Sequence, residues 1–267
     1  MRRAPVVAGQ FYHGDAGRLK KQVEGFIMDI PAKERAIGML APHAGLMYSG
    51  AVAGAVYSSI EFPHTFVLIG PNHTGLGRRA SVLSEGQWEI PTGEVSIDGP
   101  LARAIKGHAL LIEEDPQAHA FEHSLEVQLP FIRYFSEKAR IVPITVMGLT
   151  PGEAKETGLG IAAAVKETDY SVVIAASSDM SHYVPDALAR RKDNLAIERL
   201  LALDPEGLLK IVVKEKISMC GYIPAAIMLY ASLALGAKKA TLIRYATSAE
   251  ASGDYDHVVG YAGVVVK

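Results

Sequence analysis

The chain contains very little cysteine, since Cys220 is the only one among 267 residues. One cysteine excludes an internal disulfide and any zinc cluster built from cysteines. We therefore expect a reducing compartment, the cytoplasm. A basic excess is also missing, because 27 Lys and Arg stand against 29 Asp and Glu, giving a net charge of −2. Without that excess little can neutralise phosphates, so no nucleic-acid partner is expected.

Long apolar runs are absent as well. Gly9, Gln10 and His13 interrupt the stretch after Arg2 and Arg3, so we expect no export signal. No run approaches the roughly 18 apolar residues of a membrane helix, and no membrane partner is expected. Phosphate-binding loops, dinucleotide fingerprints and nucleophile elbows are missing too. What remains is a globular composition, 49% hydrophobic and 21% charged, with no linker to divide residues 1–267.

Short apolar, β-branched runs predict the strands of a sheet. Several are apolar at consecutive positions, which is typical of strands covered on both faces in a mostly parallel sheet. The predicted strands are Ala36–Ala41, Thr65–Gly70, Ile141–Val146, Ser171–Ala176, Ala240–Tyr245 and Val258–Val265.

Helical patterns alternate with these strands. The predicted helices are Asp15–Asp29, a helix rich in Ala and Gly from near Ser49, and helices at 124–136, 152–167, 186–202, 206–214 and 222–235. Residues 80–97 are expected to form short strands or a hairpin. The small residues after Ser49 are expected to let that helix lie close to the sheet. The alternation predicts one α/β domain, a three-layer α/β/α sandwich around a mostly parallel sheet.

Two matched segments mark the place for chemistry, because such sheets bind ligands beyond the carboxyl ends of their strands. His43 and His73 each follow an apolar strand and a proline, with a glycine two residues later. The two histidines are 30 residues apart, about one strand–helix–strand unit. A right-handed crossover places both at one sheet edge. Neighbouring strands lie about 4.8 Å apart, so both imidazoles are expected to converge on one ion.

A third predicted strand end carries Asp179 and His182. Two histidines and one carboxylate, with open positions, form the facial arrangement of non-haem iron sites. His182 is alternatively an acid/base beside the metal. Asp179 has an equally good alternative role as the cap of the following helix.

Further candidates lie in two polar segments and at the cysteine. His123 and Glu126 are predicted to form a wall of the site, or else a helix start with a solvated glutamate, Ser124 being the N-cap. Asp254 ends a polar stretch that either closes the pocket or is an ordinary loop. Cys220 precedes a predicted helix start, which lowers a thiol pKa, although a buried inert cysteine is the commoner case.

Taken together, these motifs resemble the Memo family over nearly the whole chain. The segments that carry the resemblance, in order, are Ala8–Tyr12, Ala41–Gly45, Tyr48–Gly50, Gly70–His73, Glu122–Glu126, Ser177–Asp179, Cys220–Gly221 and Val259–Ala262. The resemblance implies a fold like that of class III extradiol ring-cleaving dioxygenases, which hold ferrous iron with two histidines and a carboxylate and use another histidine as acid/base.

Carried over by position, the resemblance makes His43 and His73 the paired histidines and His182 a third. Animal members add a cysteine to the pocket, and the matching position here is taken to be Ala251. Without that thiol, the third ligand is expected to be a carboxylate or water. The candidate carboxylates are Glu126, Asp179 and Asp254.

The resulting prediction is a metal-dependent redox or dioxygenase-type enzyme acting on a small molecule. Its metal would be a divalent transition ion, iron before zinc or copper, held by His43 and His73, with His182 and His123 as catalytic groups. Two alternatives stay open: a non-catalytic adaptor that binds a peptide or small molecule in the same pocket, and a hydrolase with metal-activated water. The sequence leaves the substrate and the oligomeric state open, a homo-oligomer included.

Overall fold

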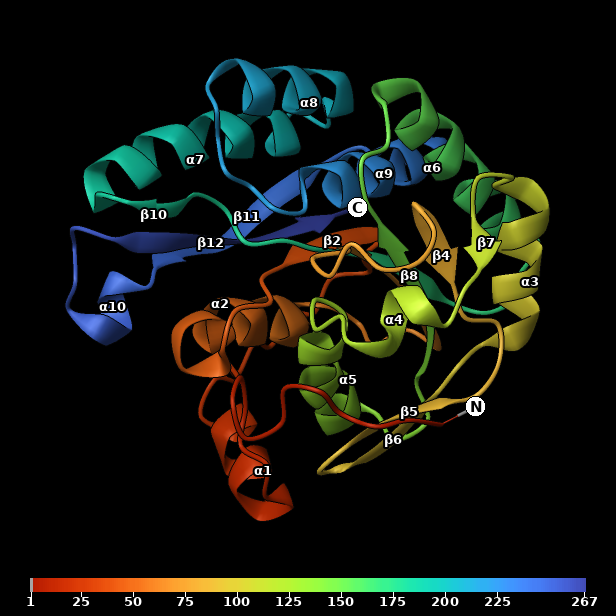
Figure 1. Cartoon of the computed structure of the whole chain (residues 1–267), viewed down its shortest axis with the longest axis horizontal. Coiled ribbons are helices and arrows are strands. Elements are labelled where there is room, and N and C mark those ends of the chain that lie inside the picture. Colours follow the sequence, from red (N-terminus) through yellow and green to blue (C-terminus); the bar gives the residue numbers. More distant parts are fainter. Residues whose placement is uncertain (1) are drawn as a thin grey trace.

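The computed structural model describes residues 2–267 and contains a nine-stranded mixed sheet (Figure 1). In spatial order its strands are β10 (His182–Val184), β12 (Val258–Val266), β2 (Gly38–Ala41), β9 (Val172–Ser177), β3 (Thr65–Pro71), β8 (Arg140–Val146), β4 (Ala80–Val82) and β7 (Glu113–Glu114), and β11 (Ala240–Thr247) pairs with β12. The central strands β2, β9, β3 and β8 run parallel. On either side, β12 and β4 pair antiparallel with them, so the sheet is less parallel than the sequence predicts.

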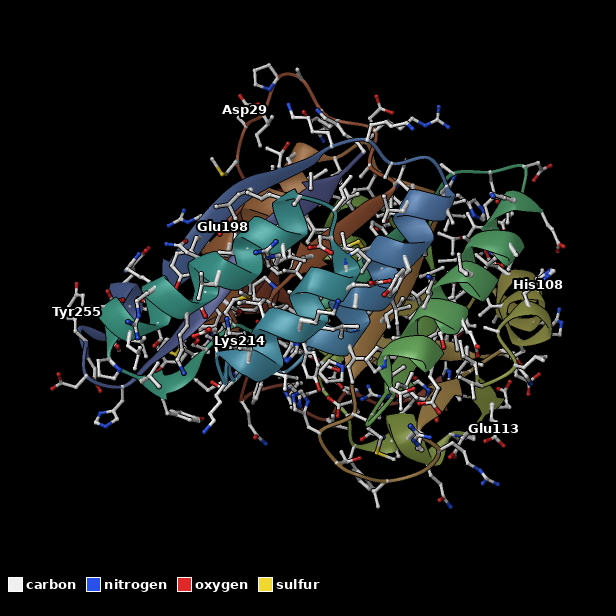
Figure 2. The ribbon with its side chains drawn as sticks, turned by 90° about the horizontal axis from the view of Figure 1, so that it is seen from above. Asp29, His108, Glu113, Glu198, Lys214 and Tyr255 are labelled. Carbon is white, nitrogen blue, oxygen red and sulfur yellow. The ribbon has the colours of Figure 1, made fainter. Side chains whose placement is uncertain are left out.

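Helices cover both faces of this sheet, which makes three layers (Figure 1). One layer contains α3 (Gly99–His108), α6 (Pro151–Lys166), α7 (Asp186–Leu201), α8 (Pro205–Lys214) and α9 (Tyr222–Ala234). The other contains α1 (Ala16–Glu24), α2 (Leu46–Ser59) and α5 (Leu129–Phe135). Seen from above, the teal, blue and green helices of the first layer lie side by side over the strands (Figure 2).

Alternate strand residues supply the two cores. Leu40 and Ile69 pack into the core beneath α6 and α9, whereas Met39 and Leu68 pack into the core beneath α1, α2 and α5. Because side chains of a strand point alternately to its two faces, a strand covered on both needs apolar residues at every position. This explains the unbroken apolar runs in the sequence.

The four predicted helices from 152 onward agree with the structure to within one residue at each end, whereas the helix predicted over Asp15–Asp29 ends at Glu24 and the one from near Ser49 begins at Leu46. The segment 124–136 is a 3₁₀ turn, Glu126–Gln128, followed by α5, and Pro130 lies in the first turn of α5. Proline fits a first turn because the amide it lacks has no partner there. Helix α3 was not predicted from the sequence; its N-cap Asp98 accepts a hydrogen bond from the Leu101 amide.

The 80–97 region contributes β4 to the large sheet and then leaves it. Its β5 (Gln87–Ile90) and β6 (Gly93–Ser96) form a hairpin, and β1 (Arg2–Arg3) pairs parallel with β5 in a separate three-stranded sheet. This pairing brings the start of the chain to the hairpin. Within residues 2–267, no helix combines the length and apolar character needed to cross a membrane.

Small residues do allow α2 to pack closely, although partly against a different neighbour than expected. A Cβ atom on Gly54 would lie 2.3 Å from the backbone oxygen of Phe26, beyond the end of α1. The close approach of α2 to the sheet instead depends on Gly263 of β12, where a Cβ would lie 2.4 Å from Val56. Two glycines on different elements therefore fix the position of the helix that follows His43.

Replacing Gly54 with alanine is expected to destabilise the fold by about 1–3 kcal/mol, because backbone must move to admit the methyl group. The matched control is Gly107→Ala in α3, where a Cβ meets nothing within 4 Å. That change is expected to stabilise by up to about 1 kcal/mol through helix propensity. Urea unfolding of both variants measures the difference, and equal effects would contradict the packing described.

Candidate metal centre

The carboxyl ends of β2, β9 and β3 meet at one sheet edge, and the first two predicted histidines lie there. His43 follows β2 and His73 follows β3, but β9 runs between these strands. The expectation that the two histidines follow neighbouring strands is thus wrong. The two side chains nevertheless come together, with ring centroids 5.2 Å apart, although β9 separates their strands.

A third imidazole completes a group that we call the histidine cluster: His43, His73 and His123. His123 lies between α4 (Gln117–Ala120) and the 3₁₀ turn, with its ring 4.7 Å from that of His73 and 5.5 Å from that of His43. One nitrogen from each ring can be chosen so that all three lie within 4.8 Å of one another. His43 is buried, whereas the His73 and His123 side chains are 34% and 22% exposed, so the cluster is open to solvent on one side.

Hydrogen bonds assign the tautomer of His43. Its Nδ1 lies 2.9 Å from the Ser177 hydroxyl, which itself donates to the Ser124 carbonyl at 2.7 Å. Because that hydroxyl has one proton, it must accept from Nδ1–H, and it also accepts from the Gln128 amide. Nε2 of His43 is therefore unprotonated in the neutral ring, and its lone pair faces the Cys220 thiol at 3.3 Å.

Glu122 assigns the tautomer of His73. Its Oε1 lies 2.9 Å from His73 Nδ1, and its Oε2 accepts the His73 backbone amide. Oε1 also accepts the Ser124 amide at 2.8 Å. Burial alone would raise the pKa of Glu122, but the hydrogen bonds from His73 and Ser124 outweigh it and lower the pKa to about 2. Ionised Glu122 thus holds the Nδ1–H tautomer of His73 and frees its Nε2.

The environment favours neutral imidazoles. Burial lowers the pKa of His43 well below its ordinary value, and the neighbouring rings of His73 and His123 act in the same direction. Burial also lowers the pKa of His123, against the opposing charge of Glu122. Both shifts favour the neutral ring, which is the form of histidine that a metal ion binds.

A thiol does lie beside the histidine cluster, and it belongs to Cys220 instead of a residue at position 251. Ala251 lies exposed in α10 (Ala249–Ser252), whereas Cys220 Sγ is 3.3 Å from His43 Nε2. Cys220 precedes the N-cap of α9, Gly221, as the sequence predicts. Burial raises the pKa of this thiol rather than lowering it, and the Asp179 charge adds to the effect. The inference that this chain lacks the thiol is therefore corrected.

Asp179 and His182 lie beside the cluster. Asp179 Oδ1 accepts the His43 amide at 2.8 Å, so it fixes the backbone that carries His43 rather than capping a helix. Burial raises the pKa of Asp179, partly offset by the His43 amide and by the charge of His182. His182 Nδ1 is 2.8 Å from the Ser218 carbonyl, which can only accept, so its Nε2 is left unprotonated in the neutral ring.

Two predicted metal ligands lie elsewhere. The Glu126 carboxylate is buried and accepts from the Arg3 guanidinium at 2.6 Å and from the Tyr12 hydroxyl at 2.6 Å. Asp254 follows α10 in an exposed loop, and its Oδ1 accepts the Asp256 amide at 2.8 Å. Both predictions are corrected: the former carboxylate binds the N-terminal segment, and the latter orders its own turn.

The carboxylate at the cluster is Glu122, whereas Glu126 was predicted from the sequence. A glutamate directly before His123 was a weak signal. The sequence predicts a helix start at Ser124 with Glu126 in its first turn, and it gives no comparable reason to select Glu122. Because Glu122 precedes the 3₁₀ turn in a loop, its side chain can turn toward His73.

Comparison with known proteins shows the family of this chain. The model of the family described as Memo-like protein matches residues 3–265. The chain belongs to the Memo family. It is 41% identical to a MEMO1 family protein of Methanopyrus kandleri over 281 residues, covering 100% of this chain and 99% of the relative. A MEMO1 family protein of Methanothermobacter thermautotrophicus is 40% identical, covering 98% of this chain and 99% of that relative.

A solved structure shares the fold of this Memo family member. It is the crystal structure of an uncharacterized protein from Escherichia coli K12, with a TM-score of 0.59 and 16% sequence identity. The match covers 86% of this chain and 100% of the other. At that identity the likeness concerns the arrangement of helices and strands alone.

Replacing Glu122 with glutamine tests the support of His73. Loss of the charge weakens the hold on the Nδ1–H tautomer, and metal affinity is expected to fall about 10–100-fold, as for other carboxylates that orient metal-binding histidines. Competition with a chelator during a Co²⁺ titration measures it. Glu24→Gln, on the exposed side of α1, serves as the control. An unchanged affinity in the Glu122 variant would contradict this role.

His119 gives a pH prediction. It lies in α4, fully buried against Trp88, and among residues 2–267 neither ring nitrogen has a hydrogen-bond partner. Burial, aided by the Arg3 charge, lowers the pKa of His119 from 6.5 to about 4. The unfolded chain therefore binds a proton first, and the stability contributed by neutral His119 is complete above pH 6.5 and lost as pH falls toward 4.

Between about pH 7 and pH 5 this loss should reach about 2 kcal/mol, at roughly 1.4 kcal/mol per pKa unit. A His119→Phe variant, which cannot be protonated, should lack it. Urea unfolding at both pH values gives the difference between wild type and variant. Parallel stability losses in the two proteins would show that His119 is not the group responsible.

Proposed function

We propose that this protein binds a divalent transition metal at the histidine cluster and uses it in redox chemistry on a small molecule. The observation that carries the proposal is the convergence of three imidazoles, with an unprotonated Nε2 assigned on His43 and on His73 by Ser177 and Glu122. On His43 the remaining nitrogen faces the Cys220 thiol at 3.3 Å, which is itself a possible metal ligand. A metal would use the unprotonated nitrogens.

The donor set fits several metals, and we place iron first. Imidazole ligands suit iron, zinc and copper, and Cys220 beside His43 offers a soft donor. The solvent-exposed side of His73 and His123 leaves room for further ligands. A bound ferrous ion would supply a redox-active centre with positions open to substrate and dioxygen. Ferrous iron and a free thiol both require a reducing setting, which supports the cytoplasm as the place of action.

The chain's own groups would handle protons around such a centre. His182 holds its Nδ1 proton toward the Ser218 carbonyl, and Nε2 is therefore the atom that accepts or donates a proton. Asp179 fixes the main chain at His43 and Ala44 through its Oδ1. Glu122 and Ser177 keep the imidazoles in one tautomer. These assignments leave His123 as a candidate ligand more than a catalytic base.

Two alternative functions, an adaptor and a hydrolase, can be distinguished from the redox enzyme by activity assays. An adaptor that binds a peptide or small molecule would load metal without His182-dependent turnover of catechol-like or phenolic substrates. A hydrolase would turn over esters, amides or phosphoesters with added zinc or manganese, and the rate would depend on His73. We place both behind the redox proposal because the cluster combines imidazoles with a neighbouring thiol.

The first experiment is elemental. Protein purified without oxygen should carry close to one equivalent of iron, zinc or copper, and a His43→Ala, His73→Ala double variant should carry less than about a tenth of that. A double variant of two exposed histidines, His13→Ala and His257→Ala, controls for adventitious binding. Equal metal content in wild type and the cluster variant would remove the proposal.

A further inference from the structure

Glu126 anchors the N-terminal segment Arg2–Tyr12, which we call the strap. Its carboxylate accepts the Val6 amide at 2.9 Å and the Val7 amide at 3.0 Å, besides the Tyr12 hydroxyl and the Arg3 guanidinium. The side chains of Glu126 and Arg3 are 0% and 3% exposed. Such a buried pair needs all its hydrogen-bonding positions filled, and the strap fills those of the carboxylate.

Arg3 makes contacts that reach beyond this anchor. Its Nε donates to the His119 carbonyl at 2.7 Å, and its Nη2 donates to the Glu122 carbonyl at 2.5 Å. The guanidinium also lies 4.0 Å above the centre of the Trp88 ring. Three nitrogens of one rigid fork are therefore bonded to the start, middle and end of residues 119–126.

That segment, 119–126, carries Glu122 and His123 of the candidate metal centre. The main chain and the side chain of Glu122 have different partners. Its backbone carbonyl accepts from Arg3, and its carboxylate binds the ring and the amide of His73. Holding the carbonyl limits rotation of the main chain at Glu122. The direction of the carboxylate and the placement of His123 follow from that main chain.

We propose that Arg3, which is remote in sequence from every histidine of the cluster, is a positioning residue of the metal centre. It acts through the carbonyls of His119 and Glu122, so that the strap is part of the site and not only part of the fold. This inference rests on the proposed metal-binding function. A planar guanidinium suits the task because its N–H groups point in fixed directions, whereas a lysine ammonium offers one point charge.

Two conservative variants separate positioning from anchoring. Arg3→Lys keeps a positive charge for Glu126 but cannot also bond both carbonyls. Tyr12→Phe removes a hydrogen bond from the same Glu126 carboxylate and leaves the Arg3 contacts to 119–126 in place. If Arg3 only anchors the strap, the two variants should behave alike.

The test uses the full chain with two readouts. In the metal-free protein, hydrogen–deuterium exchange of residues 119–126 should speed up about tenfold or more in Arg3→Lys and stay near wild type in Tyr12→Phe. In a Co²⁺ titration, Arg3→Lys should raise the dissociation constant about tenfold, with an altered visible spectrum of bound Co²⁺. Tyr12→Phe should stay within about twofold of wild type.

The outcomes are distinct. Equal exchange of 119–126 in the two variants, or equal Co²⁺ affinity and spectra, would overturn the positioning role. If wild type binds no Co²⁺, the metal-binding function fails, and the exchange measurement still decides whether Arg3 orders the segment that carries Glu122. A uniform increase of exchange across α6 and α9 in Arg3→Lys would show general destabilisation and also count against the proposal.

Discussion

The ionised carboxylate of Glu122 is buried, and the site depends on how it is compensated. A buried charge is tolerated only where hydrogen bonds replace water. Here they come from the His73 ring, the His73 amide and the Ser124 amide. These bonds connect the loop after β3 to the segment before α5. The compensation of one charge therefore fixes two loops of the candidate metal centre relative to each other.

The sheet positions the remaining histidine of the cluster, His43. β9 separates β2 from β3, and Ser177 at its end lies where it can accept from His43. Asp179, two residues later, accepts the His43 amide. β9 and the residues directly after it thus hold His43 by both the ring and the main chain of that histidine. The parallel order of the central strands brings His43 and His73 to one sheet edge, and the segment before α5 adds His123.

Much of this was predictable from the sequence. Apolar runs marked the central strands, because a strand buried on both faces has no polar positions. The matched segments around His43 and His73 marked the correct sheet edge. Strand order was not predictable, since the 30-residue spacing fits adjacent strands as well as strands separated by β9. Helix α3 escaped although Leu101, Ala102 and Ile105 form a buried face, because its ten residues include Pro100 and two glycines, which disfavour a helix elsewhere than at its ends.

The partners of the cluster were the harder part. Glu126 and Glu122 differ by four residues, and only the three-dimensional structure shows that one binds Arg3 and the other His73. Cys220 is 177 residues from His43 in sequence and 3.3 Å from its Nε2 in space. Contacts between such distant residues depend on the packing of whole elements, which local patterns in one sequence do not encode.

The most direct test of the account is anomalous diffraction from crystals grown without oxygen and loaded with ferrous iron. Data collected on either side of the iron absorption edge locate the metal without reference to any activity. The account predicts one strong peak in contact with His43, His73 and His123. No peak at that position, or a peak bound only by surface carboxylates, would contradict it.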